Sequence, residues 1–257
     1  MTRRYERYVA IGDSTTEGLE DPDGQGGYRG WADRLAERVA LHQGSLLYAN
    51  LAVRGKYTRQ ILAEQLEPAL ALKPDLVTVV VGMNDLVQPR FELEPLIADL
   101  DELQRAFAAI NATVVTFTLP DLSSIMPIAR LIVRRTRALN EALRAAAARN
   151  GAVLADIAAN PLTSDPRLWA SDRLHANTDG HTRIAGALAD ALGIPTDGMW
   201  NAPMSERPKP TLAERLAIEG RWARDHMLPW AVRGLRGTSM GDGRSGKRPV
   251  LLPVSVP

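Results

Sequence analysis

The 257-residue chain contains no cysteine. Disulfides, thiolate metal sites and a cysteine nucleophile are therefore excluded. The chain also lacks any run approaching the roughly 18 apolar residues that a membrane-spanning helix needs. Its basic start, M-T-R-R-Y-E-R, is followed by a short apolar stretch that Gly12-Asp13 interrupts, which is too little for a signal peptide. We therefore expect a cytoplasmic protein with no integral membrane segment.

Neither sign of charge dominates the composition. The chain has 31 basic and 30 acidic residues, for a net charge of +1, which gives no reason to expect a nucleic acid as partner. Hydrophobic residues at 45% and charged residues at 24% are typical of a globular protein. The length suits either one domain with an appendage or two small domains.

Short apolar runs alternate with segments of helical periodicity over the first 194 residues. This alternation predicts a parallel sheet with helices on both faces. The expected strands are residues 8–11, 46–50, 75–81, 113–118 and 152–157, and the expected helices are residues 31–41, 58–72, 92–110, 128–150 and 179–192. We therefore expect an α/β fold with a central parallel five-stranded sheet, formed by one domain over residues 1–194.

Residues 195–257 have a different character and form a second predicted segment. Prolines punctuate a linker, residues 211–227 have the spacing of an amphipathic helix, and residues 234–249 are glycine-rich and basic. The helix is expected to pack on the domain or on a second copy of the chain, which makes a homo-oligomer one alternative. Because basic residues outnumber acidic ones here, contact with an anionic surface is another. The basic tail is expected to be irregular.

The stretch Val9–Gly18, V-A-I-G-D-S-T-T-E-G, organises the candidate site. A buried strand ends at Gly12, whose backbone freedom allows a tight turn, and Ser14 follows it. Ligands of open α/β sheets bind at the carboxyl ends of such strands. Ser14 is then either a nucleophile or, with Asp13, a cap of the next helix.

Three further stretches follow the ends of other predicted strands. They are Gly55 after the second strand, Gly82–Asp85 (G-M-N-D) after the third, and the pair Asp172 and His175 before the last helix. Taken alone, Gly55 is an ordinary turn glycine and Gly82–Asp85 an ordinary strand-ending turn. Because the carboxyl ends of parallel strands share one edge of the sheet, all of them are expected to meet Ser14.

These residue types supply the parts of nucleophilic catalysis. A serine hydroxyl needs a base, and histidine, with an ordinary pKa of about 6.5, suits that role. His175 is the best candidate, with Asp172 orienting it. The attacked carbonyl develops negative charge that needs fixed donors, for which we expect the amides of Ser14 and Gly55 and the side chain of Asn84. The other three histidines, His42, His181 and His226, are expected to be structural or surface residues.

Together these stretches resemble the SGNH hydrolases, also called the GDSL esterase/lipase superfamily. The resemblance rests on Gly12–Gly18, Gly55, Gly82–Asp85 and Asp172–His175 in that order, and covers residues 8–192. It implies a flavodoxin-like three-layer α/β/α fold, no metal and no organic cofactor. It also implies ester hydrolysis through an acyl-serine intermediate, with the roles given above and a structural role for Asp13. The first block has Thr15 where leucine is common.

Several functions remain open within and outside that class. The absence of a long apolar lid favours small or short-acyl esters as substrates, with a lysophospholipase or thioesterase as the alternative. Other classes are a phosphoryl-transfer enzyme, with Asp13 as nucleophile and Asp85 and Asp172 as metal ligands, and a non-catalytic binding module. The loop positions suggest that Tyr28, Trp31 and residues 122–126 line the pocket.

Overall fold

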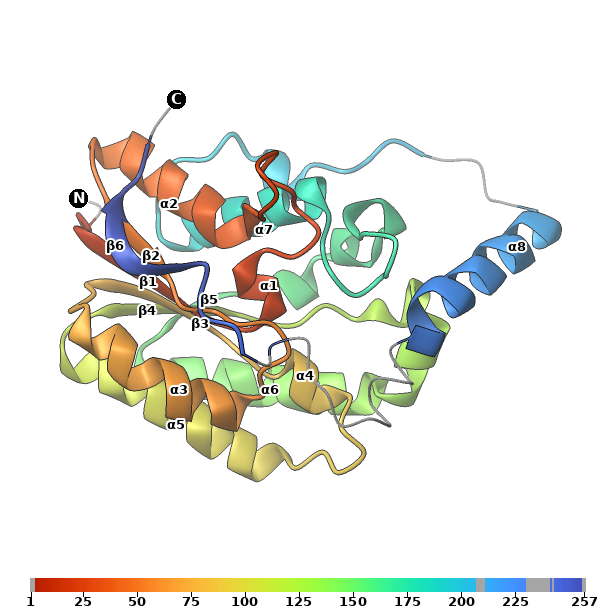
Figure 1. Ribbon diagram of the computed structural model, residues 1–257, viewed down its shortest axis with the longest axis horizontal. Coiled ribbons are helices and arrows are strands. Elements are labelled where there is room, and N and C mark those ends of the chain that lie inside the picture. Colours follow the sequence, from red (N-terminus) through yellow and green to blue (C-terminus); the bar gives the residue numbers. More distant parts are fainter. Residues whose placement is uncertain (1–2, 207–210, 230–240, 242, 256–257) are drawn as a thin grey trace.

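The computed structural model describes residues 3–206, 211–229, 241 and 243–255, and its centre is a six-stranded sheet of order β5-β4-β3-β1-β2-β6 (Figure 1). The first five strands are parallel. They are β1 (Arg7–Gly12), β2 (Leu47–Asn50), β3 (Leu76–Val80), β4 (Thr113–Phe117) and β5 (Val153–Ala155). The five predicted strands are thus confirmed, with each end within two residues of its expected place.

Helices cover both faces of the sheet and complete the three-layer α/β/α architecture (Figure 1). One face carries α2 (Gly30–Gln43) and α7 (Thr178–Ala191), and the other carries α3 (Thr58–Ala71), α5 (Leu93–Ala109) and α6 (Val133–Asn150). β1 pairs with both β2 and β3, and its residues Tyr8 to Ile11 are wholly buried. A strand covered on both faces explains why this stretch is a continuous apolar run.

One helix matches the sequence prediction closely and another differs from it. α3 ends at Ala71, one residue before the predicted end, with Pro68 inside it. The expected helix over residues 128–150 is divided into a 3-10 helix, η2 (Pro127–Leu131), and α6. The break lies at Ile132, whose φ of −110° and ψ of 3° leave the α region.

Residues 234–240 and 242 of the predicted irregular tail lie outside the described residues, and its last two residues, 248 and 249, begin a strand that was not predicted. β6 (Arg248–Pro253) pairs antiparallel with β2 and becomes the edge of the sheet beside it (Figure 1). Pro249 and Pro253 make β6 hard to recognise in the sequence, because proline lacks an N–H and is found in sheets mainly on edge strands. The same prolines protect this edge from pairing with another chain. The segment after residue 194 therefore contributes to the sheet.

Lys247, just before β6, anchors this strand to the first half of the chain. Its Nζ donates to the carbonyls of Tyr28 (2.9 Å) and Arg29 (2.6 Å) and pairs with Asp33 at 3.0 Å. The Asp33 carboxylate also accepts from the buried Tyr48 hydroxyl at 2.7 Å. A buried charge is tolerated when it is paired and hydrogen-bonded in this way.

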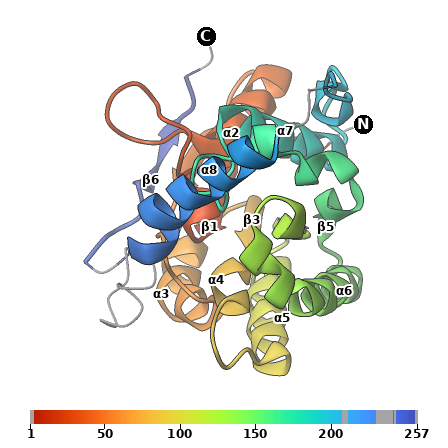
Figure 2. The same cartoon turned by 90° about the vertical axis from the view of Figure 1, so that its right-hand side faces the viewer.

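The C-terminal helix was predicted over residues 211–227. The structure has α8 (Leu212–Trp222), capped by Thr211, followed by a π-helical turn, η7 (Ala223–Met227). α8 lies on the side of the molecule at which β1 and β3 end (Figures 1 and 2). Among the residues described, no helix combines the length and the apolar character needed to cross a membrane.

Candidate active site

The carboxyl end of β1 is shaped for a turn that only glycine allows. Gly12 has a φ of 154°, and a Cβ there would lie 2.4 Å from Thr16 Oγ1 and 2.7 Å from the Val80 carbonyl. Both backbone groups of Gly12 are bonded to Gln65 on α3, whose Oε1 accepts and whose Nε2 donates, each at 2.9 Å. This clamp fixes the strand end from which Ser14 projects.

Asp13 caps the short helix α1 (Ser14–Glu17), as one sequence reading expected. Its Oδ1 accepts from the Thr15 N–H at 3.0 Å. Burial raises the pKa of Asp13 to about 6, against the opposing effects of the Thr15 N–H and of the charge on His175.

Ser14, His175 and Asp172 form a continuous hydrogen-bonded chain. Ser14 Oγ lies 2.8 Å from His175 Nε2, and His175 Nδ1 lies 2.6 Å from Asp172 Oδ2. Burial disfavours the Asp172 carboxylate, but the hydrogen bond and charge of His175 and the N–H groups of His175 and Leu174 outweigh it, so the pKa of Asp172 lies below its ordinary value. An ionised carboxylate only accepts. His175 Nδ1 therefore donates to Asp172, and Nε2 is left to accept the Ser14 proton.

The Asn84 side chain connects the segments that carry the three expected oxyanion donors. Asn84, on α4 (Met83–Leu86), donates through Nδ2 to Asp13 Oδ2 at 3.1 Å and to the Lys56 carbonyl at 3.0 Å. These bonds tie Asn84 both to the turn after Gly55 and to the segment of Ser14. Both of its N–H groups are engaged, whereas the N–H groups of Ser14 and Gly55 donate to no described group.

Glu17 holds the Gly55 turn, and the sequence interpretation missed this role. Its carboxylate accepts from the Arg54 N–H at 2.9 Å and pairs with the Arg54 guanidinium, and Glu17 is buried. A carboxylate paired and hydrogen-bonded inside the protein is a strong constraint on the turn. The sequence did contain a hint of this pair: Glu17 and Arg54 carry opposite charges, and each lies beside a motif expected at the same edge of the sheet. The hint for Gln65 was that it is a polar residue at a position where the helical spacing predicts an apolar one.

The aspartates that the phosphoryl-transfer alternative would use as nucleophile and metal ligands are hydrogen-bonded to other protein groups. Asp85 accepts from the N–H (3.1 Å) and hydroxyl (2.9 Å) of Thr58 at the start of α3, while Asp13 and Asp172 bond as described above. Burial raises the pKa of Asp85 against these hydrogen bonds. Within the described ranges, no group of three or more histidine, cysteine, aspartate or glutamate side chains is placed to hold a metal ion.

His181 is structural, as expected from its place at a helix start. Its Nδ1 accepts from the Trp31 N–H at 3.1 Å, and its Nε2 donates to the Leu19 carbonyl at 2.9 Å. Burial lowers its pKa to about 4, although the Leu19 carbonyl and the charge of Asp21 oppose this shift. His181 thereby joins three segments near the site in its neutral form.

Acid is expected to weaken the fold through His181. Between about pH 6.5 and pH 4 the unfolded histidine binds a proton that the folded one does not, so this contribution to stability is complete above pH 6.5 and is lost as pH falls. The shift corresponds to about 3 kcal/mol. We expect His181→Gln to be less stable than the parent protein at pH 7, with a difference that narrows by about this amount at pH 4.

Urea unfolding of both proteins at several pH values measures that difference. The buried Asp13 also makes stability depend on pH, with the opposite sign: because its pKa is raised to about 6, it stabilises the folded state as pH falls. Asp13 is present in both proteins, so its effect cancels in the difference between them. A difference that stays constant from pH 7 to pH 4 would contradict the assignment.

A small apolar cavity of about 50 Å³ adjoins the site. Its lining includes Thr15, Met83 and Leu174, which are chain neighbours of Ser14, Asn84 and His175. A second cavity, of about 20 Å³, is lined in part by Leu122 and Met126, in the loop suggested as a pocket wall. Met83, Pro120 and Leu174 line both cavities, which places the two side by side.

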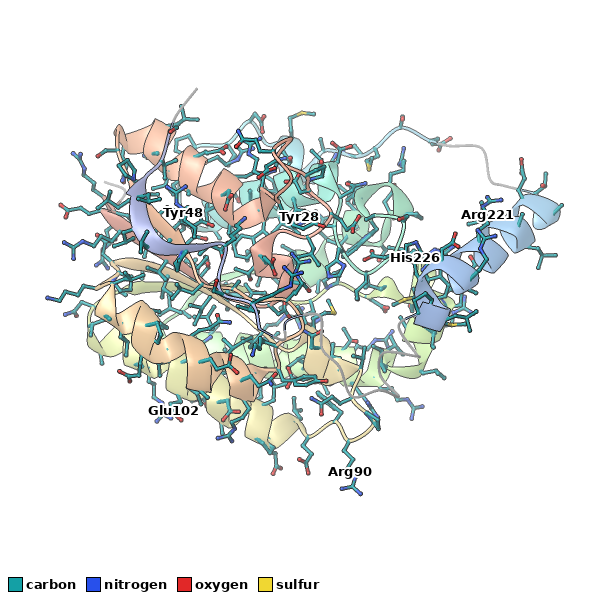
Figure 3. The ribbon with its side chains drawn as sticks, in the orientation of Figure 1. Tyr28, Tyr48, Arg90, Glu102, Arg221 and His226 are labelled. Carbon is teal, nitrogen blue, oxygen red and sulfur yellow. The ribbon has the colours of Figure 1, made fainter. Side chains whose placement is uncertain are left out.

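The other two suggested pocket residues lie elsewhere. Trp31 is wholly buried in the core, edge-on to Phe117 with ring centroids 5.5 Å apart. Tyr28, labelled in Figure 3, lines neither cavity, and the Arg54 guanidinium lies 5.3 Å from the centre of its ring. The expectation for Trp31 was wrong, and that for Tyr28 stays a prediction.

Comparisons with known proteins agree with this geometry. A model described as the GDSL-like Lipase/Acylhydrolase family matches residues 10–183. An acetylxylan esterase from Geobacillus stearothermophilus is 26% identical over 212 residues, which are 74% of this chain and 94% of that protein.

Solved structures share the fold at lower identity. LAE5, an alpha/beta hydrolase enzyme from the metagenome of Lake Arreo, Spain, has a TM-score of 0.62 at 23% identity over 74% of this chain and 95% of its own. Axe2, an acetylxylan esterase from Geobacillus stearothermophilus, has a TM-score of 0.63 at 18% identity over 77% of this chain and 97% of its own. Other Axe2 structures are of catalytic mutants in which a serine, an aspartate or a histidine is replaced.

Proposed function

Because the chain belongs to the GDSL-like lipase/acylhydrolase family, and is thus a serine hydrolase of carboxylic esters, we propose that Ser14 is its nucleophile, His175 its base and Asp172 the residue that orients the base. The observation that carries this assignment is the unbroken hydrogen-bonded chain from Ser14 Oγ through His175 to Asp172. A buried serine with a base at 2.8 Å and a carboxylate behind that base has the three groups that acyl transfer needs.

The reaction then runs in two halves. Ser14 Oγ attacks the ester carbonyl while its proton passes to His175 Nε2, and Asp172 stabilises the imidazolium. The tetrahedral intermediate collapses, the alcohol leaves with the proton from His175, and the acyl group stays on Ser14. A water molecule, deprotonated by His175, releases the acid and restores the serine. The family membership and this constellation favour an enzyme over the non-catalytic binding module.

The oxyanion of each intermediate is held by the N–H groups of Ser14 and Gly55 and by Asn84 Nδ2. The two backbone donors have no described partner to give up. Asn84 must exchange or share one of its bonds, to Asp13 or to Lys56. A donor of this kind typically lowers the barrier by about 2.7–4 kcal/mol.

The substrate is proposed to be an ester with a small or short acyl group. The cavity of about 50 Å³ beside the site is far below the roughly 300–1,000 Å³ of pockets for drug-sized ligands. The acetylxylan esterase relative points the same way. The lysophospholipase or thioesterase alternative has one observation in its favour, the apolar lining that continues into the second cavity.

A panel of p-nitrophenyl esters from acetyl to palmitoyl tests this substrate class. We expect the highest kcat/KM at acetyl to butyryl, because a longer chain exceeds the cavity. An optimum at octanoyl or beyond would favour the lysophospholipase or thioesterase alternative. Reaction with a fluorophosphonate, followed by peptide mass spectrometry, should place the label on Ser14. A label on another serine would contradict the proposed nucleophile.

A further inference from the structure

The loop of residues 170–175 carries Asp172 and His175 and folds back on itself. The Ala170 N–H donates to the His175 carbonyl at 2.9 Å, and the Arg173 N–H donates to the Ala170 carbonyl at 3.0 Å. Arg173 has a φ of 63°, in the left-handed region that residues with a side chain rarely adopt. Such a conformation persists only where surrounding contacts hold it.

Those contacts come from the C-terminal segment. Trp222 Nε1, at the end of α8, donates to the Asp172 carbonyl at 3.0 Å. Arg173 Nη1 donates to the two carboxylate oxygens of Glu219 at 2.8 and 3.0 Å, and to the Ile125 carbonyl at 3.1 Å. The guanidinium also lies 5.0 Å from the centre of the Trp222 ring. Arg173 is only 9% exposed, so these partners enclose it.

We infer that Trp222 and Glu219 are positioning residues that hold the loop of Asp172 and His175 in its active conformation, an inference that rests on the proposed function. α8 lies outside the family match, which ends at residue 183. The C-terminal segment thereby supports the active site through α8 and adds a strand, β6, to the sheet.

The contact acts on the catalytic pair through one peptide group. The carbonyl that Trp222 holds belongs to the peptide between Asp172 and Arg173, whose orientation is set by the ψ of Asp172 and the φ of Arg173. If that peptide turns, the Asp172 carboxylate and the His175 ring move relative to each other. Their hydrogen bonds, at 2.6 and 2.8 Å, depend steeply on distance and angle. Small displacements of this kind lower rates strongly.

Where the structure describes its side chains, burial on α8 and the turn after it is confined to one partly buried side, which includes Glu219 and Trp222. Leu216 and Ile218 on this helix are 65% and 41% exposed. Among the described residues, the hydrogen bonds that link residues 211–229 to the rest of the chain all end on Asp172 or Arg173. The described polar contacts of this segment with the rest of the protein therefore converge on the catalytic loop.

Three single substitutions in the full chain test the inference. Trp222→Phe removes the N–H donor and keeps a ring over Arg173, and Glu219→Gln removes the charge at nearly constant size. Arg221→Gln, at an exposed position of the same helix (labelled in Figure 3), is the matched control. Each protein is assayed for kcat and KM on the preferred p-nitrophenyl ester, for thermal unfolding, and for the far-downfield proton resonance of His175 Nδ1–H.

We expect Trp222→Phe to lower kcat about 3- to 10-fold, the usual effect of one hydrogen bond, with KM within about twofold. Glu219→Gln should lower kcat about two- to fivefold, because its carboxylate is partly exposed. In both, the downfield resonance should broaden or shift, and Arg221→Gln should match the parent protein in every measurement.

Unchanged kcat and an unchanged resonance in both variants would overturn the inference, including when their unfolding temperature falls, since a purely structural contact would behave in that way. Should Trp222→Phe not fold, Glu219→Gln decides alone. Ser14→Ala is assayed alongside. Loss of activity there with normal kcat in the helix variants refutes only the positioning role, whereas retained activity in Ser14→Ala refutes the proposed function itself.

Discussion

Replacing Ser14 with alanine is expected to lower kcat on carboxylic esters by about 10⁶-fold, the effect typical of losing a serine nucleophile in a triad. The hydroxyl makes one described hydrogen bond, to His175 Nε2. Without it His175 has no nucleophile to activate, and the remaining donors bind the carbonyl without forming an acyl-enzyme. The residual rate over water comes from those donors and from substrate binding.

The fold is expected to survive this substitution. Ser14 is the first residue of α1, where alanine is a good helix former, and its backbone N–H is unchanged. The measurement is kcat on p-nitrophenyl acetate together with thermal unfolding, with Ser45→Ala as control, because Ser45 is an exposed serine outside the site. If Ser14→Ala retains more than about 1% of the parental kcat while folded, Ser14 is not the nucleophile.

Most of the sheet and of the proposed site was predictable because the informative residues are local. Each parallel strand is a continuous apolar run, and Ser14, Gly55, Asn84 and His175 each follow the end of an expected strand. The geometry of parallel sheets then brings these ends together without any knowledge of side-chain contacts. The structure places Ser14, His175 and Asp172 in one hydrogen-bonded chain on this basis.

The features that were missed depend on pairs distant in the chain. β6 gains its structure from β2, about two hundred positions earlier, and its prolines conceal it. Glu17 with Arg54, and Trp222 with Asp172, are likewise pairs that neither local spacing nor periodicity identifies. Trp31 is a different case. Its position after a loop suggested a pocket residue, whereas its spacing with Leu35 and Val39, four and eight positions later, is that of a core-facing helix stripe. The spacing was the better guide, and Trp31 lies in the core.

Asp172→Asn is expected to lower kcat by about 10⁴-fold without preventing folding, as the matching substitution does in a serine–histidine–aspartate triad. The reason is the tautomer of His175. Asp172 Oδ1 accepts from the N–H groups of Leu174 and His175, each at 3.0 Å, while Oδ2 accepts from His175 Nδ1. An asparagine that keeps its oxygen toward the two N–H groups presents an N–H to Nδ1, which fixes the proton on Nε2 and prevents it from accepting the Ser14 proton. The opposite amide orientation would set its NH₂ group against the N–H groups of Leu174 and His175, so this orientation is disfavoured and does not restore the correct tautomer.

The assay is kcat on p-nitrophenyl acetate for Asp172→Asn, with Asp190→Asn on the exposed face of α7 as control. The double variant Ser14→Ala, Asp172→Asn adds a sharper criterion, because residues that act as one unit are not additive. It should be no slower than Ser14→Ala alone, since Asp172 acts only through His175 on the Ser14 hydroxyl. A further large loss in the double variant, or a single variant within about tenfold of the parent protein, would mean that Asp172 does not serve the serine. The acid partner of His175 would then have to be sought in the other carboxylate whose charge reaches it, the buried Asp13.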